Sequence, residues 1–138
     1  MSALKTTLSG YVGYHGREGQ LSFLLHRLTG IGTLLFLSIH ILDTATVYFF
    51  PNLYAHAIAL YRTVPFEVGE LGLVFSVLYH GSNGLRIAFF DLFPKYWKKE
   101  YSRNGVWVTL IIAVILWLPL AGIMGFNILK YNFGMFGG

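Results

Sequence analysis

Two histidines of this chain, His40 and His80, lie in the middle of long apolar segments. An ionisable side chain inside hydrocarbon is costly, so such residues are rare there and usually serve a function. A buried imidazole can donate a nitrogen lone pair to haem iron, which makes both histidines candidate axial ligands of a haem. The alternative is structural, with each histidine hydrogen-bonded to a serine or a carbonyl oxygen of a neighbouring helix.

Small residues accompany both histidines at helical spacing. Gly30 and Thr44 share the helix face of His40, and Gly84 follows one turn after His80, where it is expected to leave open space beside the imidazole. Small side chains allow a second helix or a flat ligand to approach closely. From the helical rise, we expect His80 to lie about 6 Å nearer the cytoplasmic side than His40. Such an offset leaves open whether the two histidines bind one haem or two.

A second group of polar side chains opens the first apolar segment. His26 and Arg27 stand at its beginning, with Ser22 just before them. The guanidinium group is a fixed cation with a fork of donors, suited to a haem propionate or a quinone carbonyl. The alternative is an arginine that extends to lipid phosphates at the membrane surface.

Three more charged residues lie near the ends of the apolar segments. Arg86 has the same two alternatives as Arg27, and Asp91 is in a position to pair with either arginine or to deliver protons. Asp43 lies one turn from His40 and well inside its segment. A carboxylate so far inside an apolar segment is a candidate for a proton path at the other end of the molecule.

The composition is that of a membrane protein. Of the 138 residues, 55% are hydrophobic and only 12% are charged, whereas soluble domains carry about 25% charged residues. The absence of cysteine excludes disulfides, iron–sulfur clusters and thiolate metal sites held by this chain alone. The net charge of +4 indicates loops that face an anionic lipid leaflet, and we expect no nucleic-acid partner.

Three segments are long and apolar enough to cross a hydrocarbon core of about 30 Å, which takes roughly 20 residues. They are residues 28–50, 68–90 and 106–129. The remaining segments are an N-terminal arm 1–27, an outer loop 51–67, a second loop 91–105 and a tail 130–138. Because polar side chains within the spans are costly against lipid, we predict an all-α membrane protein whose three transmembrane helices form a bundle with a second membrane subunit.

Lysine and arginine are concentrated in the arm 1–27 and in the loop 91–105. Positive loops remain in the cytoplasm. We therefore expect the N-terminus in the cytoplasm, the C-terminus outside, and a multi-pass protein of a bacterial-type inner membrane.

Two motifs resemble a known family. His26-Arg27-Leu28-Thr29-Gly30 resembles the H-R-x-[ST]-G motif of the succinate dehydrogenase cytochrome b subunit family. His80-Gly81-Ser82-Asn83-Gly84-Leu85-Arg86, followed by Asp91, resembles its second motif, H-x-x-N-G-[IL]-R-H-x-x-x-D. The resemblance covers residues 20–125. The chain departs from the family at Ile87, where a histidine is usual, and at Phe23, where a serine is usual, with Ser22 one residue away.

The resemblance implies a membrane anchor for a flavoprotein and an iron–sulfur protein, formed together with a second hydrophobic subunit. Electrons from succinate then reach membrane quinone, which joins the tricarboxylic acid cycle to the respiratory chain, and the catalytic flavin lies in another subunit. The resemblance makes His80 an axial ligand of haem b, with the other ligand from the partner subunit. It puts Arg27 near the quinone and a haem propionate.

The stretch Phe36–Thr44 resembles the first span of the two-haem branch of that family. This implies that His40 ligates a second, outer haem, that the quinone is menaquinone, and that Asp43 handles protons near an outer quinone site. Two alternatives remain: an anchor of a fumarate reductase, and a small transporter or structural membrane protein without redox function.

Overall fold

The computed structural model describes residues 18–134, with only the backbone described for residues 18 and 99–102. The arm up to residue 17 and the tail from residue 135 lie outside the described residues. Every regular element in the described range is a helix: α2 (Glu18–Phe49), α3 (Pro51–Tyr61), α4 (Val64–Leu92), the 3-10 helix η1 (Pro94–Tyr96) and α5 (Lys99–Phe133). The chain is therefore all-helical over this range, as the composition predicted.

Prolines mark where most of these helices begin. Pro51 is the first residue of α3, Pro65 lies in the first turn of α4, and Pro94 begins η1. Proline has no amide hydrogen and suits the first turn of a helix, where that hydrogen has no partner. Pro119 lies inside α5, which continues through it. Gly134 ends α5 with a positive φ of 60°, a conformation that glycine adopts without strain.

The helices are longer than the apolar segments from which we predicted them. α2 begins at residue 18, ahead of the predicted span 28–50, and α5 begins at residue 99, ahead of 106–129. The predicted outer loop 51–67 contains the helix α3. The difference arises because hydropathy locates only the apolar part of a helix, whereas polar residues at the ends of that part continue the helix.

Two helices are long and apolar enough to cross a membrane, Gly19–Phe49 and Arg103–Phe133, both within the described residues. Their most apolar windows are 0% and 17% buried, unlike the core helix of a soluble protein. α4 is less apolar along its length, because polar residues such as His80, Asn83 and Arg86 interrupt its hydrophobic residues. A third crossing by α4 remains a prediction.

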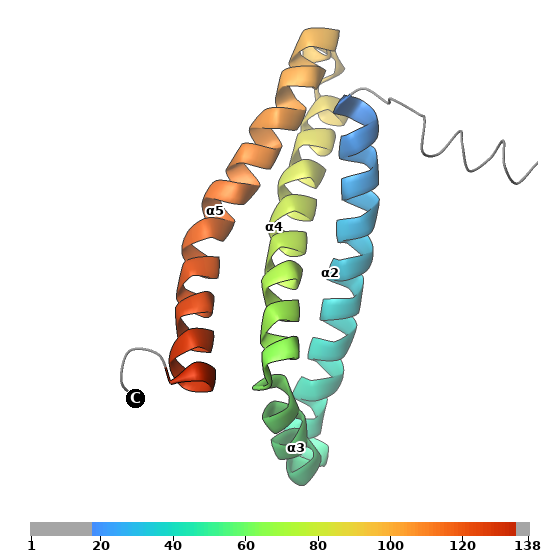
Figure 1. The fold of residues 1–138 in the computed structure, drawn as a ribbon. Coiled ribbons are helices and arrows are strands. Elements are labelled where there is room, and N and C mark those ends of the chain that lie inside the picture. Colours follow the sequence, from blue (N-terminus) through green and yellow to red (C-terminus); the bar gives the residue numbers. More distant parts are fainter. Residues whose placement is uncertain (1–17, 135–138) are drawn as a thin grey trace, which may run out of the picture.

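α4 packs along both α2 and α5, which touch each other much less, and Figure 1 shows it between them. The start of α2 lies at the same end as the connection between α4 and α5, and α3 lies at the opposite end with the end of α5 (Figure 1). The described part of the predicted arm, residues 18–27, and the second loop therefore share one end of the bundle. Which side of a membrane that end faces remains a prediction.

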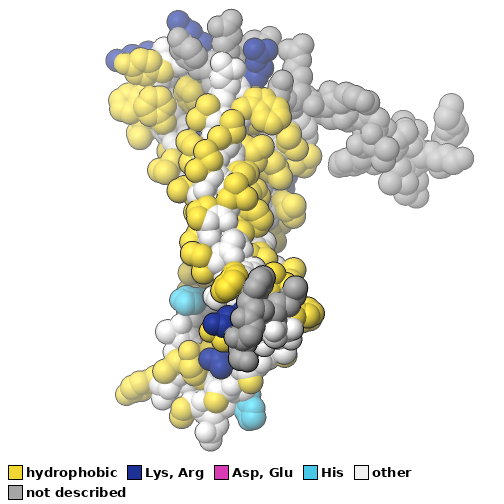
Figure 2. Space-filling model, turned by 60° about the vertical axis from the view of Figure 1, so that its left-hand side comes forward, with side chains coloured by type: hydrophobic (Ala, Val, Ile, Leu, Met, Phe, Trp, Pro, Cys, Tyr) yellow, Lys and Arg dark blue, Asp and Glu magenta, His cyan; other side chains and the backbone are white. Residues whose placement is uncertain are grey.

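The described interior is small and partly polar, whereas the outside is apolar. The side chains buried between helices belong to Ser22, Thr29, Tyr79, Asn83, Val106, Thr109, Ala113 and Ile128. Hydrophobic side chains cover the middle of the molecule, and lysines and arginines gather towards its ends (Figure 2). Small and hydroxyl-bearing residues between helices with an apolar exterior are typical of helices packed in lipid.

Candidate functional site

The imidazole of His80 on α4 is held against the backbone of α2. Its Nδ1 lies 3.0 Å from the carbonyl oxygen of His26. A carbonyl oxygen only accepts hydrogen bonds, so Nδ1 carries the proton and donates it, and the lone pair of the neutral ring is on Nε2. Metal-ligating histidines commonly use their second nitrogen in this way. A hydrogen bond from His80 to a carbonyl oxygen of a neighbouring helix therefore does not exclude His80 as a haem ligand, because Nε2 remains available.

Gly30 is the residue that makes room for His80. A Cβ atom at Gly30 would lie 2.9 Å from Cε1 and 3.1 Å from Nδ1 of His80, which requires the imidazole to move. Gly84, which we expected to leave space beside His80, faces a different ring: a Cβ there would lie 3.9 Å from Cε1 of His26. That expectation was wrong because α4 turns its Gly84 face towards the start of α2.

His26 lies flat against His80. The two ring centroids are 4.1 Å apart and the planes differ by 5°. The Nδ1 atom of His26 is buried and has no hydrogen-bond partner among the described residues. We name His26, Gly30 and His80 the His80 cluster.

His40 and His80 lie at clearly different depths. Because His80 contacts His26 and Gly30, it is level with the early part of α2. From Gly30 to His40 the helix rises about 15 Å, at about 1.5 Å per residue. The expected offset of about 6 Å was therefore too small, because counting along each helix separately ignored how far α4 is shifted against α2. One iron atom cannot join both histidines across this distance, since a metal–imidazole bond is about 2 Å long.

A polar network joins α2 to α4 beside the His80 cluster. Arg86 Nη2 donates to Ser22 Oγ at 3.1 Å, Ser22 Oγ donates to Asn83 Oδ1 at 3.2 Å, and the Tyr79 hydroxyl donates to Ser22 Oγ at 3.5 Å. Ser22 is 3% exposed, and Tyr79 and Asn83 are each 1% exposed. We name these four residues the Ser22 network.

Arg86 also contacts the third long helix. A Cβ atom at Gly105 of α5 would lie 3.2 Å from Cδ of Arg86. Arg86 therefore lies where α2, α4 and α5 meet, with its guanidinium on Ser22 of α2. From the sequence, Ser22 and Arg86 were predicted to lie near a haem propionate or a quinone. In the structure both side chains form contacts between helices.

Arg27 and Asp91 are both exposed near this end of the bundle. The guanidinium carbon of Arg27 lies 5.3 Å from the centre of the Phe23 ring. Asp91 and Arg86 line a cavity of about 430 Å³ with Ile87, Phe90, Pro94 and Trp97. The predicted residues of this end thus divide into a buried set, centred on Ser22, and an exposed set that a ligand or partner can reach.

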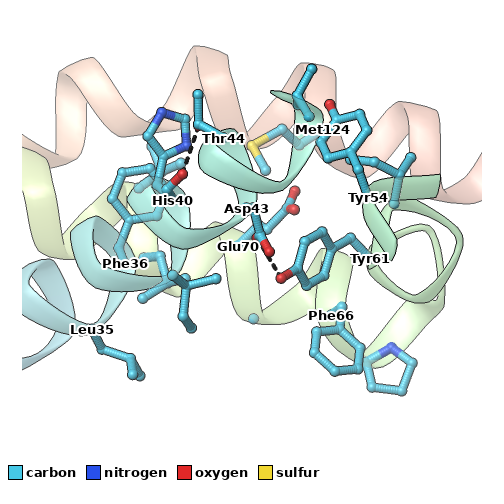
Figure 3. Close-up of a pocket in the computed structure, with 17 residues that line it drawn as sticks. Leu35, Phe36, His40, Asp43, Thr44, Tyr54, Tyr61, Phe66, Glu70 and Met124 are labelled. Carbon is cyan, nitrogen blue, oxygen red and sulfur yellow. Dashed lines mark hydrogen bonds between the residues drawn. The ribbon is translucent and has the colours of Figure 1, made fainter. Parts of the chain in front are cut away.

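A larger cavity lies at the opposite end of the bundle, and we name it the His40 cavity (Figure 3). Its volume is about 680 Å³, within the range of about 300–1,000 Å³ that ligand pockets span. Its lining comes from α2, α3, α4 and α5: Leu35, Phe36, Ile39, His40, Asp43, Thr44, Val47, Tyr54, Ile58, Tyr61, Pro65, Phe66, Gly69, Glu70, Leu73, Val74 and Met124. The walls are mostly apolar, with a few polar side chains.

His40 itself is exposed, and its ring stacks on Phe36 with a centroid distance of 5.6 Å. Asp43 accepts a hydrogen bond of 2.5 Å from the Tyr61 hydroxyl, which links α2 to α3 (Figure 3). This bond, together with burial, raises the pKa of the Tyr61 phenol above its ordinary value. Asp43 therefore has a protonated donor beside it.

The structure adds two features that the sequence did not suggest. Asn83 belongs to the Ser22 network, and α3 brings Tyr54 and Ile58 to the His40 cavity. The position of Asn83 within a motif that also holds His80 and Arg86 was a signal of its importance but not of its contacts. Within residues 18–134, no group of three or more histidine or acidic side chains could hold a metal ion.

Comparison with known proteins gives two matches. Residues 11–121 match a family described as "Succinate dehydrogenase/Fumarate reductase transmembrane subunit". The chain is also 30% identical over 120 residues to the "Succinate dehydrogenase 2 membrane subunit SdhC" of Mycobacterium tuberculosis (strain ATCC 25618 / H37Rv). That alignment covers 86% of this chain and 85% of the relative.

Proposed function

The chain belongs to the succinate dehydrogenase/fumarate reductase transmembrane subunit family, and from this membership we propose that it is the haem-binding, quinone-facing anchor of a succinate dehydrogenase. In this role it joins the iron–sulfur subunit of the complex to quinone in the membrane. The flavin site at which succinate is oxidised belongs to another subunit.

The observation that carries this proposal is the hydrogen bond from His80 to the carbonyl oxygen of His26. It leaves the lone pair on Nε2, as an axial ligand requires. His80 is half-buried, so its imidazole can meet a macrocycle held between this chain and a neighbour. A haem held there would take its other protein ligand from the partner anchor subunit. When bound, haem b accepts and releases one electron.

The exposed residues near His80 are suited to the edge of such a group. Arg27 presents a guanidinium fork that matches a propionate or a quinone carbonyl. Asp91 and Arg86 border the smaller cavity. Ser22 and His26 contribute indirectly in this proposal: Ser22 ties α2 to α4, and His26 supports His80.

We assign His40 to a second haem at the opposite end, and menaquinone as the quinone. Two observations support a separate role for His40: its large offset from His80 along α2, and its position on the wall of the His40 cavity. Asp43, with the Tyr61 hydroxyl beside it, is the candidate proton path at this end.

The partners follow from surfaces that this chain leaves open. α2 exposes Arg27 and His40 within a candidate membrane span, where contact with lipid is costly. We propose that the second hydrophobic anchor subunit covers the surface of α2 on which His40 is exposed. The flavoprotein and iron–sulfur subunits then dock at the cytoplasmic end, formed by the start of α2 and the connection between α4 and α5, with the C-terminus on the outer side of the inner membrane.

The test is a dithionite-reduced minus oxidised spectrum of the purified complex, with haem quantified per flavin. Two low-spin b haems per flavin support the proposal in full, and one haem removes the role of His40. Absence of a visible band and of a copurifying flavoprotein would leave a non-redox membrane protein or transporter. The ratio of succinate oxidation to fumarate reduction distinguishes a succinate dehydrogenase from a fumarate reductase, which the family also includes.

A further inference from the structure

One turn of α2 holds the imidazole of His80 in three ways. The carbonyl oxygen of His26 accepts a hydrogen bond from Nδ1 at 3.0 Å. The ring of His26 stacks on one face of the imidazole, with centroids 4.1 Å apart. The missing side chain of Gly30 lets the edge with Cε1 and Nδ1 lie where a Cβ would be only 2.9 Å and 3.1 Å away.

These three contacts restrict different features of the ring. The hydrogen bond determines which nitrogen carries the proton, because its acceptor is a carbonyl. The stack determines the plane of the ring, since the two imidazoles are parallel within 5°. The close approach at Gly30 determines how near the ring lies to α2. Together they leave Nε2 with one direction in which to point.

We propose that Gly30 and His26 are positioning residues that set the plane and the tautomer of His80 and thereby tune the metal group that His80 binds. This inference rests on the proposed function, because it concerns His80 as a ligand. The hydrogen bonding and orientation of an axial imidazole affect both affinity for the group and its reduction potential. A single methyl group added to α2 at Gly30 should therefore change a haem property although the proposed ligand His80 is retained.

Helix packing is the competing explanation, and the chain contains a matched control for it. Gly32 lies two residues after Gly30 on α2. A Cβ atom at Gly32 would lie 2.9 Å from Oγ and 3.2 Å from Cβ of Ser76 on α4. Gly30→Ala and Gly32→Ala thus add the same group to the same helix at the same closest distance. Only the methyl group at Gly30 meets His80.

The experiment compares both variants with the parent in the purified complex. The measurements are haem per flavin, the low-spin EPR signal of the oxidised complex and the reduction potential. For Gly30→Ala we expect at least a threefold loss of haem or a tenfold change in the reduction equilibrium, about 59 mV for one electron. For Gly32→Ala we expect both properties within twofold of the parent. Equal effects of the two variants, or a Gly30→Ala complex like the parent, overturn the proposal.

Variants of His26 decide the matter if Gly30→Ala prevents assembly. His26→Phe retains an aromatic ring for the stack and His26→Ala removes it, while the carbonyl oxygen remains in both. We expect the EPR signal of His26→Phe to lie closer to that of the parent than the signal of His26→Ala does. Identical signals in the two His26 variants overturn the positioning role. A parent complex without haem contradicts the proposed function itself, whereas haem that depends on His80 but not on Gly30 or His26 contradicts only this inference.

Discussion

The two ends of the bundle surround a histidine in opposite ways. At one end, the His80 cluster and the Ser22 network consist of side chains that contact one another, and Tyr79 and Asn83 are almost fully buried. At the other end, His40 is exposed on the wall of a cavity of about 680 Å³. The chain alone orients His80, whereas it leaves His40 for another component to cover.

This difference shows that residue type and depth do not determine a histidine's role. Both histidines lie on long helices between apolar residues, but among the described residues only His80 has a ring nitrogen hydrogen-bonded by the protein. An engaged second nitrogen fixes a ligand in advance, which lowers the cost of binding. We therefore expect His80 to retain its function under conditions in which His40 loses its own.

The largest expected effect separates the two histidines directly. His80→Ala should lower haem per flavin at least tenfold for the haem at its own end, because the variant lacks the imidazole whose Nε2 is the proposed ligand. His40→Ala should remove only the second haem. The measurement is the reduced-minus-oxidised spectrum of each purified complex at two potentials, which resolves two b haems.

His56→Ala is the control for these two variants, because His56 is exposed on α3 and does not line the His40 cavity. Its complex should match the parent. Loss of all haem in His40→Ala, with His80 intact, would contradict the proposed difference between His80, which the chain orients, and His40, which is exposed on a cavity wall. Retention of both haems in His40→Ala would end the proposed role of His40.

A smaller effect tests whether the Ser22 network stabilises the packing of α2 against α4. Asn83→Ala removes the acceptor of the Ser22 hydroxyl inside the bundle. Hydrogen bonds between membrane helices contribute about 0.6 kcal/mol and up to about 1.7 kcal/mol, and a buried donor left unpaired costs about 1–3 kcal/mol. We expect a loss of about 1–2 kcal/mol, measured as a lower midpoint of thermal dissociation of the complex.

The other end supplies a matched asparagine. Asn132 is exposed and donates to Glu67 at 2.6 Å, which links α5 to α4. Because exposed substitutions usually change stability by less than about 0.5 kcal/mol, Asn132→Ala should leave the midpoint almost unchanged. Equal losses for the two asparagines would mean that the buried network has no special importance for stability.

Much of the fold was predictable because the underlying signals are local. The apolar segments were enough to predict helical structure and the approximate places of the three long helices, although not their starts. The length of α2 and the helical state of residues 51–61 were not predictable from hydropathy, since polar residues continue a helix that nothing interrupts. Hydropathy identifies a membrane crossing by α4 less clearly than the other two, because His80, Asn83 and Arg86 interrupt its apolar residues.

The candidate residues were predictable, but their partners were not. Their motifs marked His26, His80 and Arg86 before any contact was known. The stacking of His26 on His80, and the contact of Arg86 with Ser22, depend on how far α4 is shifted along α2. The spacing of residues within one helix gives no information about that shift. For this reason the expected offset of 6 Å between His40 and His80, and the expected space beside His80 at Gly84, were wrong.

The smallest expected effect concerns the hydrogen bond from Tyr61 to Asp43, which holds α3 beside the His40 cavity. Tyr61→Phe removes one bond to a carboxylate at a partly exposed site, worth about 0.5–1.5 kcal/mol. Opening of α3 should therefore increase about two- to tenfold. The measurement is the rate of trypsin cleavage after Arg62, an exposed residue at the end of α3.

The pH dependence of that cleavage sharpens the test. Because the pKa of Tyr61 is raised in the folded chain, its contribution to stability is complete below the ordinary pKa of about 10 and is lost only as the pH rises through the raised value. The ratio of cleavage rates between Tyr61→Phe and the parent should thus be the same at pH 7 and pH 9. Tyr131→Phe, at an exposed tyrosine of α5, should cleave like the parent. A ratio of one at both pH values would mean that apolar packing alone holds α3 in place. The hydrogen bond from Tyr61 to Asp43 would then contribute nothing measurable to the stability of α3 beside the His40 cavity.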